Sequence, residues 1–227
     1  MAHKEQGYRF RIDYDLDHRK KVIDGFDQIV VVPVNTEIKK DQTVLNFDNV
    51  KKIVDASKKI TVMDCSCRKD LKRCDAPVET CMTFDESAES ILKSEDARIR
   101  SYKPHPVSHE EAMEVLKKSA EAGLVHLAYI DKDSEGKIGT VCSCCSCCCE
   151  NLGSILRFGM APQLLKASAK SVRDSSRCKN CGTCVDRCHF GARKMINGKL
   201  EYNQDRCLGC GLCVSTCPAN AITLNQL

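Results

Sequence analysis

The chain has 227 residues, 18 cysteines, no tryptophan and a formal net charge of +4. Its start, MAHKEQGYRFRIDYDLDHRK, is charged throughout and has no apolar core of a signal peptide, which argues against export and a disulfide framework. No apolar run approaches the ~18–20 residues of a membrane span. We therefore expect a cytoplasmic protein without direct membrane insertion, whose clustered cysteines bind metal.

The positive net charge does not indicate a nucleic-acid partner. It counts every cysteine as neutral, whereas four thiolates around a [4Fe–4S]²⁺ core carry about −2 in total. Two such clusters would bring the chain to a net charge of about 0, and four would bring it to about −4. A redox-responsive regulator that binds DNA is a third class of function, but the sequence has no clear basic recognition helix.

The first sixty residues hold no cysteine and are expected to be scaffold. Residues 28–38, QIVVVPVNTEI, have the β-branched composition of a strand. Residues 46–60 place apolar side chains on one face of a helix with Asn46 or Asp48 as its N-cap; these side chains are Phe47, Val50, Ile53 and Val54. The following ITVMD is predicted to be a short strand that carries Cys65 and Cys67 at its end.

Four thiols then fall within seventeen residues: Cys65, Cys67, Cys74 and Cys81. Four is the number required by one iron–sulfur cluster or one zinc ion. Basic residues lie among them and are predicted to lower the thiol pKa values and to offset the charge of a cluster; they are Arg68, Lys69, Lys72 and Arg73. The alternative is a solvated basic loop.

A second cysteine segment follows a predicted helix and two strands. The helix begins with a capping box, Ser108 and Glu111, ends at Gly123, and turns four apolar side chains inward: Ala112, Val115, Leu116 and Ala122. The first strand is residues 124–130, where His126 is expected to be packed rather than a ligand. After a turn at residues 131–136, the second strand runs into VCSCCSCCCE, which we expect beside the first segment; its thiols are Cys142, Cys144, Cys145, Cys147, Cys148 and Cys149.

After an apolar helix broken near Pro162, the chain carries two tandem repeats of Cys-x2-Cys-x2-Cys-x3-Cys. Their cysteines are Cys178, Cys181, Cys184 and Cys188, then Cys207, Cys210, Cys213 and Cys217. A pair of zinc sites is the alternative, although zinc motifs rarely use this spacing. The repeats resemble the bacterial two-cluster ferredoxins over roughly residues 172–227.

This resemblance implies two [4Fe–4S] clusters, with the fourth cysteine of each repeat bound to the opposite cluster. Cluster I would then take Cys178, Cys181, Cys184 and Cys217, and cluster II would take Cys207, Cys210, Cys213 and Cys188. Gly182, Gly209 and Gly211 let the backbone approach the sulfides. Asn197-Gly198 predicts a type I′ hairpin between the repeats. The proline that follows the fourth cysteine in the family is present as Pro218 but is replaced by His189 in the first repeat.

Over roughly residues 45–227 the order of CxCR, CCxCC and ferredoxin motifs looks like a group of iron–sulfur proteins of anaerobes. The paired cysteines are also distantly similar to the cysteine-rich domains of heterodisulfide reductases, which bind noncubane clusters, although the glycine that usually follows the pair is absent. We expect an α+β protein with three parts: an N-terminal α/β cysteine-rich domain at residues 1–150, a helical linker at 151–171, and a ferredoxin-like domain at 172–227.

Three functions compete for VCSCCSCCCE: a metallothionein-like store, a thiol site that attacks disulfides, and one or two further iron–sulfur clusters built jointly with the first segment. The third is favoured, because ten thiolates at one site need cations and the nearby basic side chains are too few and too exposed. With no nucleotide, flavin or molybdenum motif, the prediction is an electron-transfer protein or subunit of an anaerobic oxidoreductase, which passes single low-potential electrons and has a redox partner or larger complex. The alternative is a reductase of a disulfide or polysulfide.

Overall fold

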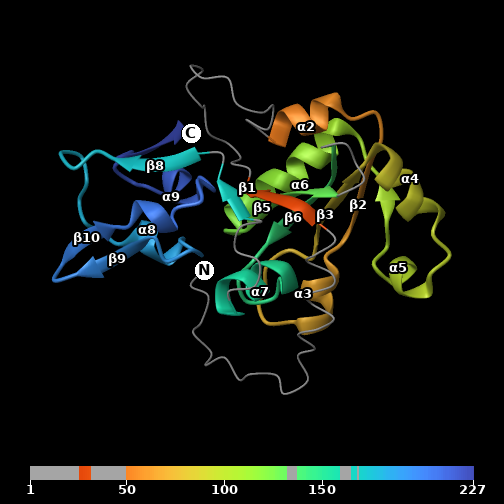
Figure 1. Cartoon of the computed structure of the whole chain (residues 1–227), viewed down its shortest axis with the longest axis horizontal. Coiled ribbons are helices and arrows are strands. Elements are labelled where there is room, and N and C mark those ends of the chain that lie inside the picture. The colour runs from red at the N-terminus through yellow and green to blue at the C-terminus, as the bar shows by residue number, and fades with distance from the viewer. Residues whose placement is uncertain (1–25, 32–49, 132–136, 159–164, 168) are drawn as a thin grey trace.

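The computed structural model describes residues 26–31, 50–131, 137–158, 165–167 and 169–227. Figure 1 shows a first lobe that contains the described residues up to 167 and a second, smaller lobe from residue 169 onward. The first lobe contains β1 (Phe26–Val31), α2 (Val50–Ala56), β2 (Ile60–Asp64), α3 (Ser66–Leu71), β3 (Glu79–Phe84), α4 (Asp85–Lys93), α5 (Ala97–Ser101), β4 (His105–Pro106), α6 (His109–Glu121), β5 (Val125–Asp131), β6 (Ile138–Cys144), α7 (Glu150–Phe158) and β7 (Leu165–Ala167). The second lobe contains β8 (Ala169–Arg173), α8 (Thr183–Asp186), β9 (Arg193–Ile196), β10 (Lys199–Tyr202), a 3₁₀ turn η2 (Gln204–Arg206), α9 (Leu212–Ser215) and β11 (Ile222–Gln226).

A seven-stranded sheet with the order β4-β2-β3-β6-β5-β1-β7 forms the first lobe. Its strands pair antiparallel except for β1 and β7, which are parallel. Two parallel strands need a long crossover connection between them. β5 and β6 are consecutive strands joined by a short connection, and they pair antiparallel. The expected α+β class therefore holds for the described residues, and the sheet of the first lobe, where an α/β domain was predicted, is mainly antiparallel.

Helices α2 and α6 cover one face of this sheet with an apolar core. Val50, Val54 and Leu116 are fully buried there against Met82 and Val141 of the sheet. Both predicted helices are confirmed within the described residues, and the capping box of α6 is present with both of its hydrogen bonds. Phe47 and the predicted caps Asn46 and Asp48 lie outside the described residues.

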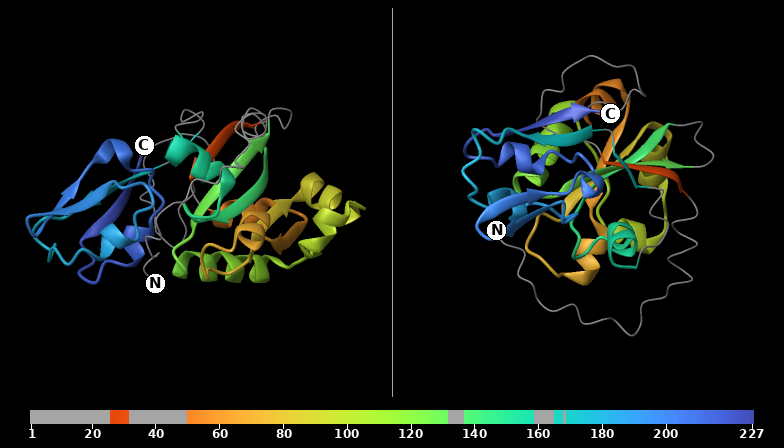
Figure 2. Two further views of the ribbon diagram at one scale, coloured as in Figure 1. Left: turned by 90° about the horizontal axis from the view of Figure 1, so that it is seen from below. Right: turned by 60° about the vertical axis from the view of Figure 1, so that its left-hand side comes forward.

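The opposite face of the sheet carries thiols. Strand alternation places Cys142 and Cys144 of β6 on the same face as Leu127 of β5, in a second core. Leu152 of α7 and Phe190 of the second lobe pack on this core, so that the second lobe lies against the thiol-bearing face. The left-hand view of Figure 2 shows the two lobes side by side.

His126 lies in β5 opposite Ser143 rather than opposite a cysteine. Its side chain is 2 % exposed, and its Nδ1 lies 2.9 Å from the Ser143 Oγ. Burial lowers the pKa of His126 to about 4. This environment agrees with the prediction of a packed histidine rather than a metal ligand.

The segment between the lobes is only partly helical. Helix α7 ends at Phe158, Pro162 lies outside the described residues, and β7 adds an edge strand beside β1 that the apolar pattern did not indicate. Strand β8 begins at Ala169, so the predicted boundary at residue 172 falls inside a strand. Residues 132–136 of the turn predicted at 131–136 also lie outside the described residues, as does the part of the first predicted strand beyond Val31.

The second lobe consists of two small sheets, β8 with β11 and β9 with β10, and the short helices α8 and α9. Asn197 and Gly198 have φ of 49° and 72°, which confirms the predicted type I′ hairpin. Gly209 has φ +66°, and a Cβ there would lie 2.0 Å from the carbonyl oxygen of Ala169, so this turn requires glycine. No helix among the described residues has both the length and the apolar character needed to cross a membrane.

Candidate metal and cluster sites

The cysteines of the first lobe lie where strands end. Cys65 follows β2 and precedes α3, and Cys67 lies in the first turn of α3. Cys81 lies in β3 directly opposite Cys142 of β6, so the register of two strands brings the two cysteine segments together. The prediction that Cys65 and Cys67 are carried at the end of a strand is confirmed, as is the proximity of the two segments.

Six of these thiols form one group, which we call the six-thiol ring. The pKa of each member responds to the side chains of two others, in the cyclic order Cys65, Cys67, Cys149, Cys144, Cys142 and Cys81. Four members are at most 6 % exposed, and Cys67 and Cys142 are half-buried. The bond with Cys67 lowers the pKa of Cys65, but Cys81 and burial raise it to about 12. Bound cations would be needed to hold these buried sulfurs as thiolates.

The other four thiols form a separate group, which we call the four-thiol site: Cys74, Cys145, Cys147 and Cys148. All four Sγ atoms lie within 4.8 Å of one another. The Cys74 Sγ is 3.7 Å from the Cys145 Sγ and 3.8 Å from the Cys148 Sγ. The first cysteine segment therefore does not make one site of its own, because Cys74 joins the second segment while its three companions enter the ring.

Arg68 lies between the ring and the four-thiol site. Its side chain is 2 % exposed and donates to the carbonyl oxygens of Pro77 and Ser143 at 2.6 and 2.9 Å. Its Nη2 is also 3.8 Å from the Sγ of Cys145. Burial alone would lower the pKa of Arg68, but the charges of Cys65 and Cys145 raise it.

This position of Arg68 corrects two expectations. The residue is neither in a solvated loop nor too exposed to balance thiolate charge. Hydrogen bonds from Cys147 and Cys148, and then the charge of Arg68, lower the pKa of Cys145. The pKa values of Cys65 and Cys67 are raised overall, because neighbouring thiols and burial outweigh the lowering influences, which for Cys65 include the charge of Arg68.

In the second lobe, the four cysteines that the ferredoxin resemblance assigns to cluster II line a single cavity: Cys188, Cys207, Cys210 and Cys213. Three of them come from the second repeat and Cys188 comes from the first, which is the crossed arrangement. The backbone N–H groups of Ala192 and Ala221 each donate at 3.3 Å to the fourth cysteine of their own repeat, four residues earlier. The two repeats thus share their local geometry.

Three of the cysteines assigned to cluster I lie in one apolar group with Leu200 and Ile222; they are Cys178, Cys184 and Cys217. The fourth, Cys181, is exposed, with its Sγ 3.5 Å from the Thr183 hydroxyl. Cluster I therefore has a solvent-facing side. Cluster II does not share this exposure, because Cys188 and Cys210 pack against the core that also holds Cys144 and Cys149 of the ring.

His189 joins the two lobes. Its Nδ1 lies 3.1 Å from the Oγ of Ser146, between the cysteines of the four-thiol site, and its Nε2 lies 2.7 Å from the carbonyl oxygen of Gly123. Arg187 adds a bond from Nη2 to the carbonyl oxygen of Glu121 at 2.9 Å. The missing proline after Cys188 was the sequence signal for this contact, since proline has no side-chain donor or acceptor.

Sequence reasoning missed a buried arginine in the second lobe. Arg193 is 2 % exposed, donates to the Ser171 hydroxyl at 2.8 Å and stacks over Tyr202 at 4.4 Å. Its Nη1 has no hydrogen-bond partner, and no described carboxylate pairs with it. A buried guanidinium that faces thiols without a counter-ion fits an anionic cluster, because a buried charge needs a partner.

Two quartets of cysteines on crossed tandem repeats, with a buried cation between them, define an iron–sulfur domain. Residues 171–224 match the family described as "4Fe-4S dicluster domain". A comparison with curated proteins found no match. The second lobe is thus a ferredoxin-like iron–sulfur domain, and both thiol sites of the first lobe lie outside the matched residues.

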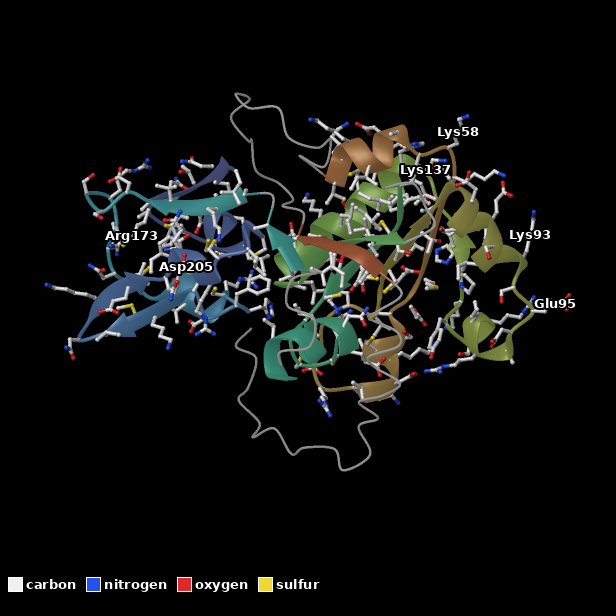
Figure 3. The ribbon with its side chains drawn as sticks, in the orientation of Figure 1. Lys58, Lys93, Glu95, Lys137, Arg173 and Asp205 are labelled. Carbon is white, nitrogen blue, oxygen red and sulfur yellow. The ribbon has the colours of Figure 1, made fainter. Side chains whose placement is uncertain are left out.

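The labelled charged side chains of the first lobe lie on its surface. In Figure 3, Lys93 and Glu95 lie at the end of the first lobe that points away from the second lobe. They are surface charges, and salt would screen their effect on the clusters.

Proposed function

We propose that this protein transfers single electrons between the two ferredoxin clusters and a further iron–sulfur cluster held by the six-thiol ring. The observation that carries the proposal is the shared core between the lobes. Cys188 and Cys210 of cluster II pack in the same core as Cys142, Cys144 and Cys149 of the ring. This packing places the cysteines of the two proposed centres in one core, as electron exchange without a mobile carrier would require.

Burial favours electron transfer over direct attack on a disulfide or polysulfide. A thiol that attacks a disulfide must be reached by its substrate. Four members of the ring are nearly inaccessible, and their neighbours are other cysteines and apolar side chains. A metallothionein-like store would have no use for the ferredoxin domain beside it.

The exposed side of cluster I supports a route for electrons. Cys181 is open to solvent, whereas cluster II is covered by the first lobe. Electrons from a redox partner would therefore reach cluster I first, pass to cluster II and then to the ring. Comparable ferredoxin clusters work near about −400 mV, which fits a place in an anaerobic, cytoplasmic oxidoreductase system.

Iron and acid-labile sulfide per chain test the proposal on the whole protein purified without oxygen. We expect wild type to contain more than the ~8 irons and ~8 sulfides of two cubanes, and the double variant Cys81→Ser, Cys144→Ser to return to about 8 sulfides with a parallel loss of iron. Ser66→Ala, which changes the residue between Cys65 and Cys67 but no thiol, is the control and should keep the wild-type content. Equal iron and sulfide in wild type and the double variant would refute a cluster in the ring.

Replacement of His189 by proline, the residue at this position in the resembling family, tests the connection between the lobes. Loss of two hydrogen bonds at about 1 kcal/mol each should weaken the interface by roughly 2 kcal/mol while both ferredoxin clusters remain. Hydrogen exchange at Ser146 and Gly123 should rise, and rapid-mixing reduction should show slower electron arrival at the ring. His105→Ala, an exposed histidine of the first lobe, is the control. Unchanged exchange and unchanged electron arrival in His189→Pro would contradict the prediction.

A further inference from the structure

We infer that the four-thiol site binds a single divalent metal ion, Zn²⁺ or Fe²⁺, in tetrahedral coordination by Cys74, Cys145, Cys147 and Cys148. This site is distinct from the clusters of the proposed electron-transfer chain, and it would stand even if the ring held no cluster. The inference rests on the spacing of the sulfur atoms, on the groups that surround them and on a contrast with the other cysteines of the same chain.

The spacing matches one central ion. A metal–thiolate bond to Zn²⁺ is about 2.3 Å long, so the sulfurs of a regular tetrahedron lie about 3.8 Å apart. The closest Sγ pairs of the site are Cys74 with Cys145 at 3.7 Å, Cys74 with Cys148 at 3.8 Å and Cys147 with Cys148 at 3.9 Å. No pair exceeds 4.8 Å. An ion at the centre would need only small side-chain adjustments.

The spacing does not match a cubane. In a [4Fe–4S] cluster each thiolate binds a different iron, so the four ligand sulfurs lie roughly 6 Å apart. The chain provides an internal reference, because its ferredoxin domain has cysteines arranged for such clusters. Among the described residues, only the four-thiol site has ligand atoms this close together, and neither the ferredoxin quartets nor the six-thiol ring does.

The surroundings fit a closed structural site. Four thiolates and a divalent ion carry a net charge of about −2. Arg68 offers its guanidinium to Cys145, and Arg73 donates from Nη1 to the carbonyl oxygen of Cys147 at 3.3 Å. Leu124 and Ala76 pack on the sulfurs. With four protein ligands the ion has no open position, so its role is to tie the loop after α3 to the loop after β6.

The choice of ion follows from the donors. Thiolates select zinc, iron and copper(I) over magnesium or calcium, and a tetrahedral set of four sulfurs suits Zn²⁺ and Fe²⁺. Both ions would hold the two loops in the same way. Only Fe²⁺ would add a redox change, so the identity of the ion decides whether this site also carries electrons.

The test is a metal and sulfide analysis of the full chain purified without oxygen. The double variant Cys74→Ser, Cys148→Ser should lose about one zinc or about one iron atom per chain and no acid-labile sulfide. Asp75→Asn, an exposed neighbour of Cys74, is the control and should lose neither. Loss of about four irons with about four sulfides would show a cubane and overturn the inference, as would an unchanged metal content.

A second measurement tests the inference even if the double variant Cys74→Ser, Cys148→Ser does not fold. X-ray absorption at the zinc edge of wild type should show a single shell of sulfur at about 2.3 Å and no metal neighbour. If the ion is iron, the ring variant Cys81→Ser, Cys144→Ser, in which the four-thiol site is intact, should retain about one iron in excess of sulfide. Cubanes hold iron and sulfide in equal number, so the excess reports the single ion. A wild-type protein that contains no zinc and no iron in excess of sulfide would overturn the inference. The ring variant alone tests the proposed electron transfer, so the two failures are distinguishable.

Discussion

Replacement of Arg68 by methionine is expected to lower the free energy of unfolding by about 3–5 kcal/mol and to reduce the metal content of both thiol sites of the first lobe. The guanidinium is buried and donates to the carbonyl oxygens of Pro77 and Ser143. Methionine would fill much of the volume, but it would remove the hydrogen bonds to these two buried acceptors and leave the nearby thiolates without their cation.

The measurement is thermal unfolding under anaerobic conditions together with metal analysis. For a chain of this size the midpoint should fall by roughly 10 °C. Arg68→Lys should lie between wild type and Arg68→Met, because lysine keeps the charge but lacks the two guanidinium nitrogens that reach Pro77 and Ser143 separately. Arg73→Met, which removes an exposed arginine near the same site, is the matched control and should shift the midpoint little. A metal content in Arg68→Met equal to wild type would show that the buried charge is not needed.

Most elements near the cysteines could be predicted because their patterns are local. The capping box at Ser108, the alternation of residues 124–130 and the Asn197-Gly198 turn each depend on a few neighbouring residues. The mainly antiparallel sheet and β7 could not be predicted, because strand order depends on pairing between segments far apart in the chain. β7 is only three residues long, too short for a periodic signal.

The division of the thiols could not be read from spacing. Cys74 and Cys81 are seven residues apart, yet they belong to different sites. Cys74, in the loop after α3, lies in the four-thiol site, whereas Cys81, in β3, lies in the six-thiol ring. The register of β3 against β6 places Cys81 opposite Cys142, whereas Cys145 lies beyond the end of β6. A sequence gives the number of thiols, but only strand register and the end of a strand determine which of them face each other.

The two buried arginines were missed for the same reason. In the sequence, Arg68 is one of four basic residues near the first cysteines and has no mark that separates it from the others. Arg193 is the first residue of β9, in the hairpin that Asn197-Gly198 predicts. Burial of an arginine requires an anion or several acceptors, and these come from segments that are distant in sequence. In both sites the nearby groups include cysteines, which links the position of the charge to the metal chemistry.

The reduction potentials of the ferredoxin clusters should depend on Arg193. After burial, which raises the thiol pKa values of Cys184 and Cys213, the charge of Arg193 is the next influence on both, and it lowers them. The resemblance assigns Cys184 to cluster I and Cys213 to cluster II, so one guanidinium acts on both centres. Each cluster gains a negative charge on reduction, and a buried cation stabilises that reduced state.

Arg193→Met should therefore lower both reduction potentials by on the order of 100 mV. The estimate takes the Coulomb energy of a unit charge at about 6–8 Å from a cluster, with an effective dielectric constant of about 20. This energy is converted at about 59 mV per 1.4 kcal/mol for one electron. Voltammetry of the anaerobic full-length protein measures the shift. Arg193→Lys should keep most of the wild-type potential. Lys194→Met removes an exposed charge from the next residue of β9, and solvent screening should limit its effect to a small fraction of the Arg193→Met shift. Equal shifts in Arg193→Met and Lys194→Met would show that net charge, rather than the buried guanidinium, sets the potentials.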